Sequence, residues 1–315
     1  MPAARVTCPA TSANLGPGFD ALGLALALHN RFVVTPRAEG FVLRARGGEG
    51  SGAERLGEDP EGSLVVRGFQ AARAALGLAP APGLEVEVEV EVPTGRGLGS
   101  SATAVVAGVL AASALSQAEG GPALDPDRAL DLAVALEGHP DNVAPCLLGG
   151  VCAALRGPDG RVVHARAAPA NLPVAVAVIP LDREKSTEVM RRLLPASVPF
   201  ADAVDTVGRL SLLLFALLTD APALLPQALE DRLHQPYRGP AVPAFDEARA
   251  AGRAAGAHGV VLSGSGPTLL ALAPDRAAGA AAGQAIVEVW ARAGVRAVAR
   301  VVDVDLAGAR VTVAP

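Results

Sequence analysis

The sequence is poor in aromatic residues and in cysteine. Phe, Trp and Tyr together make up 3% of the 315 residues, so a buried core has to be built from Ala, Val and Leu. Three cysteines occur, Cys8, Cys146 and Cys152, and no two of them form a C-x-x-C pair. An odd number of scattered cysteines favours neither a disulfide framework nor a zinc site. We therefore expect all three to be small, buried apolar residues.

The sequence also lacks an excess of positive charge. It holds 27 Lys and Arg against 32 Asp and Glu, for a net charge of −5. Nucleic-acid-binding proteins favour a basic surface, so we expect no nucleic-acid partner. The N-terminal residues MPAARVTCPAT do not resemble a signal peptide, and the longest apolar run, residues 210–218, is too short to cross a bilayer. These absences favour a cytoplasmic protein without a membrane partner.

The length of the chain favours two domains with a sizeable buried core. Apolar segments at residues 151–155 and 161–167, joined by Gly157-Pro158-Asp159-Gly160, predict a hairpin. The continuous apolar run at residues 173–179 then predicts a buried strand that opens the second half. We therefore expect a first domain over residues 1–165 and a second over residues 166–315, each of the α+β class.

A glycine-rich loop, PTGRGLGSSAT at residues 93–103, is the strongest local motif. Residues 84–92 alternate apolar and acidic side chains and predict a half-buried strand, and residues 101–117 predict a helix. Glycines and a helix N-terminus suit a phosphate, and Ser101 could reach a phosphate-bound Mg²⁺. The loop lacks the lysine of a Walker A motif and the G-x-G-x-x-G spacing. An ordinary glycine turn without a ligand stays open.

A second polar motif, EGHPDN at residues 137–142, follows a predicted helix over residues 126–137. A helix C-terminus disfavours nearby negative charge, so a bound Mg²⁺ would explain Glu137 at that position. The ordinary alternative is a polar turn that ends the helix, and His139 alone is more often structural. Two further loops, residues 9–20 and 263–268, combine glycine with hydroxyl and amide side chains. Each fits either a surface turn or a ligand site.

Taken together, these motifs resemble the GHMP small-molecule kinases. PTGRGLGSSAT resembles the ATP-phosphate loop of that family, and SGSGPT at residues 263–268 resembles its C-terminal glycine loop. PATSANLGPGFDALGLAL and EGHPDNVAP are similar to the branch that acts on L-homoserine. The resemblance runs from Val6 to Thr268. It implies a two-lobed α+β fold, with an N-terminal ribosomal-protein-S5-like α/β lobe, a C-terminal ferredoxin-like lobe and a site between them.

The resemblance implies an enzyme that transfers the γ-phosphoryl group of ATP to the side-chain hydroxyl of L-homoserine. The product would be O-phospho-L-homoserine, used in threonine biosynthesis, and relatives suggest a homodimer. It implies Mg²⁺ on Ser101 and Glu137. It implies ATP on the two glycine loops, at Pro93, Thr94, Gly95, Arg96, Gly97, Leu98, Gly99, Ser100, Ser101, Ala102, Thr103, Gly264 and Ser265.

The resemblance also implies a substrate site drawn from both halves of the chain. Asp20 suits the ammonium group of an amino acid, and Arg191 and Arg238 suit its carboxylate because a guanidinium binds carboxylates through two parallel hydrogen bonds. The implied substrate-binding residues are Asn14, Asp20, His139, Asn142, Thr187, Arg191 and Arg238, and the implied catalytic residues are Asp141, Asn142 and Arg191.

Some positions depart from the family pattern or leave alternatives open. Ser63 stands where many members have an asparagine near adenine, and Arg96 could either add charge to the polyphosphate or face solvent. Asp141 is the nearest candidate base, but no clear Lys–Asp pair occurs, so we expect catalysis mainly by transition-state stabilisation. Another GHMP enzyme, acting on mevalonate or a sugar, and a non-catalytic ATP-binding regulator are the alternative classes.

Overall fold

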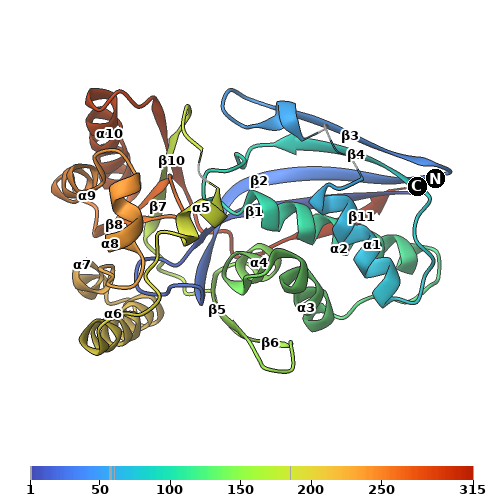
Figure 1. The fold of residues 1–315 in the computed structure, drawn as a ribbon, viewed down its shortest axis with the longest axis horizontal. Helices are drawn as coiled ribbons and strands as arrows, with labels where there is room; N and C mark the ends of the chain where they lie inside the picture. Colours follow the sequence, from blue (N-terminus) through green and yellow to red (C-terminus); the bar gives the residue numbers. More distant parts are fainter. Residues whose placement is uncertain (1, 57–58, 60, 185, 315) are drawn as a thin grey trace.

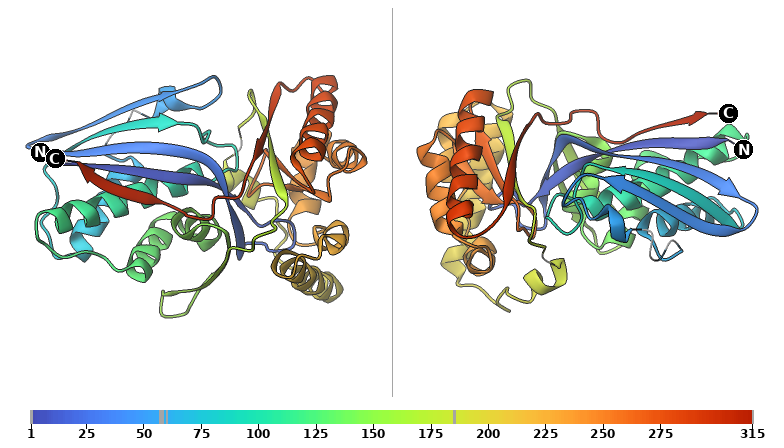
Figure 2. Two further views of the ribbon diagram at one scale, coloured as in Figure 1. Left: turned by 180° about the vertical axis from the view of Figure 1, so that it is seen from behind. Right: turned by 90° about the horizontal axis from the view of Figure 1, so that it is seen from above.

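The computed structural model describes residues 2–56, 59, 61–184 and 186–314. Within these residues the chain forms two lobes, each built on its own sheet and covered by helices (Figure 1). The mixture of helices with largely antiparallel strands confirms the predicted α+β class. The α+β lobes lie end to end, and the glycine-rich segments face the junction between them (Figures 1 and 2).

The first lobe contains a seven-stranded sheet of strands that are mostly antiparallel. The strand order is β11-β1-β2-β4-β3, with β5 paired to β2 and β6 paired to β5. Only the β3–β4 pair is parallel among these described strands. The strands are β1 (Ala3–Ala13), β2 (Leu22–Arg37), β3 (Gly40–Gly47), β4 (Gly83–Val90), β5 (Val151–Arg156), β6 (Val162–Ala167) and β11 (Arg310–Ala314).

The alternating sequence of β4 decides which face of this sheet is buried. Leu84, Val86, Val88 and Val90 are buried, and the intervening glutamates point to the other face, as the period of two predicts. Four helices pack against the apolar face, seen below the strands in Figure 1. They are α1 (Leu64–Ala75), α2 (Ser100–Ala118), α3 (Pro126–Glu137) and α4 (Pro140–Leu148), with a short 3₁₀ turn η1 (Ala53–Arg55).

The second lobe contains an antiparallel four-stranded sheet of order β10-β7-β9-β8, with helices on both faces. Its strands are β7 (Val174–Pro180), β8 (Gly259–Leu262), β9 (Leu269–Ala273) and β10 (Ala297–Val302). Helices α9 and α10 cover one face, and α6 packs on the other. The helices are α5 (Thr187–Arg191), α6 (Phe200–Leu218), η2 (Pro222–Leu224), α7 (Leu225–Ala228), α8 (Gln235–Arg238), η3 (Gly239–Ala241), α9 (Phe245–Ala254) and α10 (Arg276–Arg292).

The end of the chain returns from the second lobe to the first. After β10, Asp303 O accepts a hydrogen bond from Ala27 N, and Asp305 N donates to Ala25 O, so this segment crosses beside β2. Strand β11 then pairs antiparallel with β1, with Ala3 opposite Ala314, and the two termini lie side by side (Figure 2). The domain boundary at residues 165 and 166 stays a prediction.

Several local predictions are confirmed and others are not. The hairpin of β5 and β6, the buried strand β7 and helices α2 and α3 lie where the patterns predict them. Residues 9–20 were expected to form one loop, but β1 continues to Ala13, with a shift of its register against β2 between Pro9 and Ala10.

The apolar helix α2 is a core helix of the first lobe. By length and composition alone it could cross a membrane, but 67% of its most apolar window is buried inside the fold. It packs against β1 and α1, and its small side chains allow these elements to approach it closely. The three cysteines are buried and free, as expected from their number and spacing.

Candidate functional site

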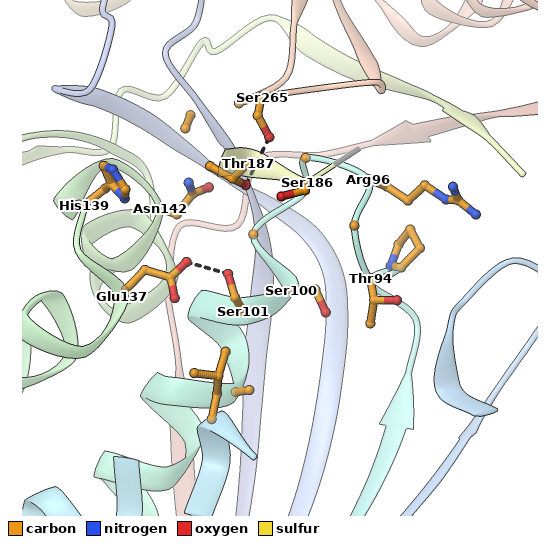
Figure 3. A pocket seen from close by; sticks show the side chains of 18 of the residues that line it. Thr94, Arg96, Ser100, Ser101, Glu137, His139, Asn142, Ser186, Thr187 and Ser265 are labelled. Carbon is orange, nitrogen blue, oxygen red and sulfur yellow. Dashed lines mark hydrogen bonds between the residues drawn. The ribbon is translucent and has the colours of Figure 1, made fainter. Parts of the chain in front are cut away.

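A cavity of about 620 Å³ lies at the junction of the lobes and is lined from both (Figure 3). It collects the glycine loop before α2, the start of α4, the short helix α5 and the loop between β8 and β9. The predicted site residues that line it are Asn14, Asp20, Pro93, Thr94, Gly95, Arg96, Gly97, Gly99, Ser100, Ser101, Glu137, His139, Asp141, Asn142, Thr187, Arg191, Arg238, Gly264 and Ser265.

Three residues predicted to bind ATP do not line the cavity. Leu98, Ala102 and Thr103 are buried beneath the glycine loop. The Thr103 hydroxyl donates to Ser100 O (2.7 Å) and accepts from Asn30 Nδ2 (2.9 Å), which fixes the start of α2 on strand β2. These side chains therefore support the loop from behind.

Two glycines of the first loop are required for two reasons: their backbone is left-handed, and neighbouring atoms leave no room for a Cβ. Gly97 and Gly99 have φ values of 77° and 71°, in the left-handed region. A Cβ on Gly97 would lie 2.4 Å from Ser263 O, and one on Gly99 would lie 1.9 Å from the Thr11 hydroxyl oxygen. The Ser263 hydroxyl also donates to Gly97 O (2.7 Å). The two glycine loops are therefore packed directly against each other.

The first turn of α2 offers a positive site to the cavity. The N–H groups of a first helical turn have no acceptor within the helix, and Gly99 at the N-cap has no side chain that could accept from them. The partial positive charge of the helix N-terminus adds to these donors. Ser100 and Ser101 stand at this end of the helix and face the cavity (Figure 3). This arrangement suits an anion such as a phosphate.

Ser101 and Glu137 meet above this turn. The Ser101 hydroxyl donates to a Glu137 carboxylate oxygen, as the dashed line in Figure 3 marks. Burial raises the pKa of Glu137, and the Ser101 hydrogen bond partly opposes that rise. Among the residues that the structure describes, no three or more His, Cys, Asp or Glu side chains gather as a metal-binding group. These two oxygen donors would therefore need ligands from outside the protein to hold a hard cation such as Mg²⁺.

Residues expected to lie on a turn instead open a further helix. Gly138 ends α3, and Pro140 occupies the first turn of α4, where a missing N–H is tolerated. Asn142 Oδ1 accepts from the Thr11 hydroxyl (2.7 Å). His139 lies beside the cavity, and its pKa is lowered by burial and by nearby Arg191.

Asp141 is the most perturbed carboxyl group of the site. Its side chain is 4% exposed, and its Oδ1 has no hydrogen-bond partner in the described structure. Burial, and secondly the charge of Asp20, raise the pKa of Asp141 to about 7. Backbone N–H groups at the start of α4 and the Arg191 charge oppose part of this rise. The group is therefore close to half-protonated near neutral pH.

Asp20 and Arg191 form a bidentate ion pair across the two lobes. Arg191 Nη1 and Nη2 each donate to an Asp20 carboxylate oxygen at 2.9 Å. This hydrogen bonding raises the pKa of Arg191. The backbone N–H of Asp20 donates to Asn14 Oδ1 (3.0 Å), and Asn14 Nδ2 donates to Gly264 O (2.9 Å). Asn14 therefore joins the N-terminal loop to the C-terminal glycine loop.

Arg238 and Thr187 complete the cavity wall from the second lobe. Arg238 is 2% exposed; its Nε donates to Met190 O (3.3 Å) and its Nη1 to Gly264 O (3.4 Å). Burial, and secondly the charge of Arg191, lower its pKa. The Thr187 and Ser265 hydroxyls lie 3.3 Å apart, so α5 is tied to the second glycine loop (Figure 3).

Arg96 does not face solvent. It is 3% exposed, and its guanidinium extends away from the cavity (Figure 3), where Nη2 donates to Leu181 O (2.8 Å) and lies 3.5 Å from Glu184 Oε1. Of the two alternatives left open for Arg96, the solvent-facing side chain is therefore excluded. The backbone of Arg96 still lines the cavity, and its side chain connects the first glycine loop to the second lobe.

Sequence reasoning missed two aromatic side chains beside the site. Phe19 stacks on His234 with ring centroids 5.2 Å apart, and the guanidinium carbons of Arg191 and Arg238 lie 5.7 and 5.1 Å from the Phe19 centroid. A signal existed for Phe19, because it is the one aromatic residue of the segment 9–20 in a chain with 3% aromatics. His234 had no local signal.

The two halves of the chain match the two parts of one family of kinases. Residues 63–150 match the sequence profile "GHMP kinases N terminal domain", and residues 215–292 match "GHMP kinases C terminal".

Curated relatives resemble the chain over nearly its whole length. A homoserine kinase of Synechococcus sp. (strain CC9902) is 43% identical over 308 residues, which cover 96% of this chain and 94% of the relative. A homoserine kinase of Nostoc sp. is 44% identical over 311 residues, with 96% and 97% covered.

Solved structures share the fold. The homoserine kinase of Cytophaga hutchinsonii superposes with a TM-score of 0.86 at 31% identity, covering 98% of this chain and 97% of that one. The L. major mevalonate kinase reaches a TM-score of 0.67 at 18% identity, over 91% of this chain and 90% of that one, and this likeness shows the fold alone.

Proposed function

Because the chain belongs to the GHMP kinase family, we propose that it transfers the γ-phosphoryl group of ATP to the side-chain hydroxyl of L-homoserine. The product is O-phospho-L-homoserine, an intermediate of threonine biosynthesis. One observation carries the choice of substrate. The same cavity is lined by a helix N-terminus that suits a phosphate and by an acid with two arginines. An amino acid with a reactive hydroxyl matches this second set of groups.

The ATP phosphates bind the glycine loop and the first turn of α2. The backbone amides and the helix dipole supply fixed positive potential for the β- and γ-phosphates, and Gly264 and Ser265 border the same space. Ser101 and Glu137 would hold the Mg²⁺ that accompanies ATP, which is supported by their converging oxygens. A magnesium ion bound there would neutralise phosphate charge.

L-Homoserine binds beside Asp20 and the two arginines of the cavity. Asp20 receives its ammonium group, and Arg191 and Arg238 receive its carboxylate. Asn14, Thr187, His139 and Asn142 border the remainder of the substrate. In the present structure Asp20 and Arg191 bind each other. The substrate therefore separates this pair and satisfies each partner with one of its own two charges.

Catalysis depends mainly on positioning and on charge stabilisation. Arg191 and the Asn142 amide both line the cavity, and we expect them to stabilise the negative charge that develops on the transferred group. Asp141 is the candidate base for the proton of the substrate hydroxyl, and it lines the same cavity. Because its pKa is about 7, it accepts that proton only in the fraction of molecules in which it is ionised.

Release of ADP in the presence of ATP and Mg²⁺ tests the proposal. L-Homoserine, mevalonate, galactose and shikimate are compared at equal concentrations. We expect turnover with L-homoserine well above that with the other three alcohols. Preferred turnover of another alcohol would assign the chain to a different branch of the family. Binding of ATP without turnover of any alcohol would indicate a regulator.

We also propose a cytoplasmic homodimer that pairs through α6. Phe200, Val204, Val207, Phe215 and Leu218 are between 51% and 85% exposed, and their spacing puts them on one face of the helix. That face carries no charged side chain, and pairing along 19 residues of helix would bury on the order of 1,000 Å² in total. Light scattering should report a dimer for the native chain and a monomer for Phe215→Glu; equal masses would contradict the α6 interface.

A further inference from the structure

Phe19 lies where the two arginines of the cavity come together. The guanidinium carbons of Arg191 and Arg238 lie over its ring, 5.7 and 5.1 Å from the centroid. The arginines come from different helices, α5 and α8, and the ring comes from the N-terminal loop of the other lobe. We propose that Phe19 is a positioning residue that orients both guanidinium groups toward the substrate carboxylate. This inference rests on the proposed function.

Two adjacent guanidinium groups need a partner that leaves their N–H groups available. Arg191 has the Asp20 carboxylate, whereas Arg238 is hydrogen-bonded to two backbone carbonyls. The face of an aromatic ring attracts a cation through its quadrupole without accepting its in-plane hydrogen bonds. A guanidinium stacked on the ring therefore keeps its planar fork of donors for a carboxylate. The attraction of each guanidinium to the ring also compensates part of the repulsion between the two cations.

His234 stacks on the Phe19 ring and supports it. The rings of Phe19 and His234 are nearly parallel, with an interplanar angle of 21°. His234 is 0% exposed, its Nε2 donates to Gly16 O (3.0 Å), and its backbone N–H donates to Asp231 Oδ2 (2.9 Å). Burial lowers the pKa of His234, so the imidazole is neutral near pH 7 and adds no third positive charge. The ring therefore rests on a fixed, uncharged support.

Asp20, the residue after Phe19, links the aromatic ring to the ion pair with Arg191. Phe19 and Asp20 are consecutive, so one short turn contacts Arg191 both through a ring face and through a carboxylate. When the substrate displaces Asp20 from Arg191, the ring contact is the one that remains. Phe19 therefore keeps Arg191 in place during the exchange of partners. Without it, we expect the carboxylate site to lose affinity while the ATP site is unaffected.

Steady-state kinetics of Phe19→Leu and Phe19→Tyr test this role. Leucine retains apolar bulk but has no ring face, whereas tyrosine keeps the face. Loss of two cation–π contacts should raise the KM for L-homoserine on the order of tenfold in Phe19→Leu. The KM for ATP should stay within about twofold, and Phe19→Tyr should be close to the native enzyme. Phe41→Leu, at a partly buried phenylalanine of β3 that does not line the cavity, is the matched control and should change neither constant.

Calorimetric titration separates this inference from the proposed function, because it needs no phosphoryl transfer. L-Homoserine is compared with its methyl ester, which lacks the carboxylate. The native chain should bind the acid more tightly than the ester, and Phe19→Leu should lose most of that preference while Phe19→Tyr keeps it. An unchanged preference for the acid in Phe19→Leu would refute the positioning role of Phe19, even if turnover is observed. Absence of turnover in the native chain would overturn the proposed function instead.

Discussion

Asp141 offers a test in which stability and catalysis can be measured on the same variant. The carboxyl group is nearly inaccessible, its Oδ1 has no hydrogen-bond partner among the described residues, and its pKa is about 7 against 3.8 for an ordinary Asp. Asp141→Asn keeps the shape of the side chain and removes its charge. We expect this variant to be more stable than the native protein at alkaline pH.

The magnitude follows from the difference between the folded and unfolded pKa values. A shift of about three units at about 1.4 kcal/mol per unit gives an upper limit of roughly 4 kcal/mol well above pH 7. The asparagine amide introduces donors of its own, and leaving them unpaired costs about 1–3 kcal/mol. A net gain of about 1–3 kcal/mol at pH 8 is therefore expected, or a rise in Tm of a few degrees.

The dependence on pH has a definite sign. The folded state holds its proton more tightly than the unfolded state, so the Asp141 carboxyl does not oppose folding below pH 3.8. Folding stability then falls as the pH rises from 3.8 through 7. The advantage of Asp141→Asn over the native protein should therefore grow by about 2–3 kcal/mol between pH 5 and pH 8. This difference does not depend on how well the new amide is accommodated.

Chemical denaturation between pH 5 and pH 8.5 measures this advantage directly. Glu119→Gln changes an exposed carboxylate at the end of α2 and is the matched control, for which we expect no comparable trend. A constant stability difference between Asp141→Asn and the native protein across this range would refute the raised pKa.

Kinetic measurements on the same variant test whether catalysis needs a base. If Asp141→Asn abolishes turnover and still binds ATP and L-homoserine, catalysis requires a base and the transition-state interpretation is wrong.

Two further substitutions test the ATP end of the cavity. Gly99→Ala puts a methyl group 1.9 Å from the Thr11 hydroxyl oxygen at a φ of 71°, so the loop has to shift; we expect ATP affinity to fall at least tenfold, measured by calorimetry, because helix-terminal amides lose alignment. A native affinity would show that the loop tolerates a Cβ. Glu137→Gln replaces the carboxylate proposed for Mg²⁺ with a neutral amide; the Mg²⁺ concentration for half-maximal turnover should rise several-fold, and an unchanged requirement would locate the metal elsewhere.

The local parts of this protein could be predicted because their signals lie in contiguous sequence. The strict alternation at residues 84–92 predicts strand β4, and the glycines that follow predict a loop at the start of α2. Helix α4 was missed because Gly138 and Pro140 both indicate a turn, whereas proline is also favoured in the first turn of a helix. Gly138 and Pro140 therefore fit both a turn and the start of a helix, and tertiary packing decides between the two.

The partners within the site could not be predicted from local patterns. The motifs identified Asp20 and Arg191 as site residues, but their mutual ion pair joins positions 171 residues apart. Phe19 and His234 are likewise brought together only by the closure of the two lobes. The direction of Arg96 depends on a carbonyl group at Leu181 in the second lobe. Sequence patterns identify the side chains of the site, whereas packing between distant segments determines which of them are in contact.

The pairing of β11 with β1 has a consequence for how the chain is made. The edge of the first sheet beside β1 is completed by residues 310–314, which are synthesised long after β1. The first lobe therefore cannot reach its final form until residues 310–314 have been made, because β1 stays unpaired on that edge until then. Exposed edges of this kind recruit other strands. A cut after residue 165 would leave the same edge open permanently, whereas joining the adjacent termini and opening the chain at a surface loop would keep it closed.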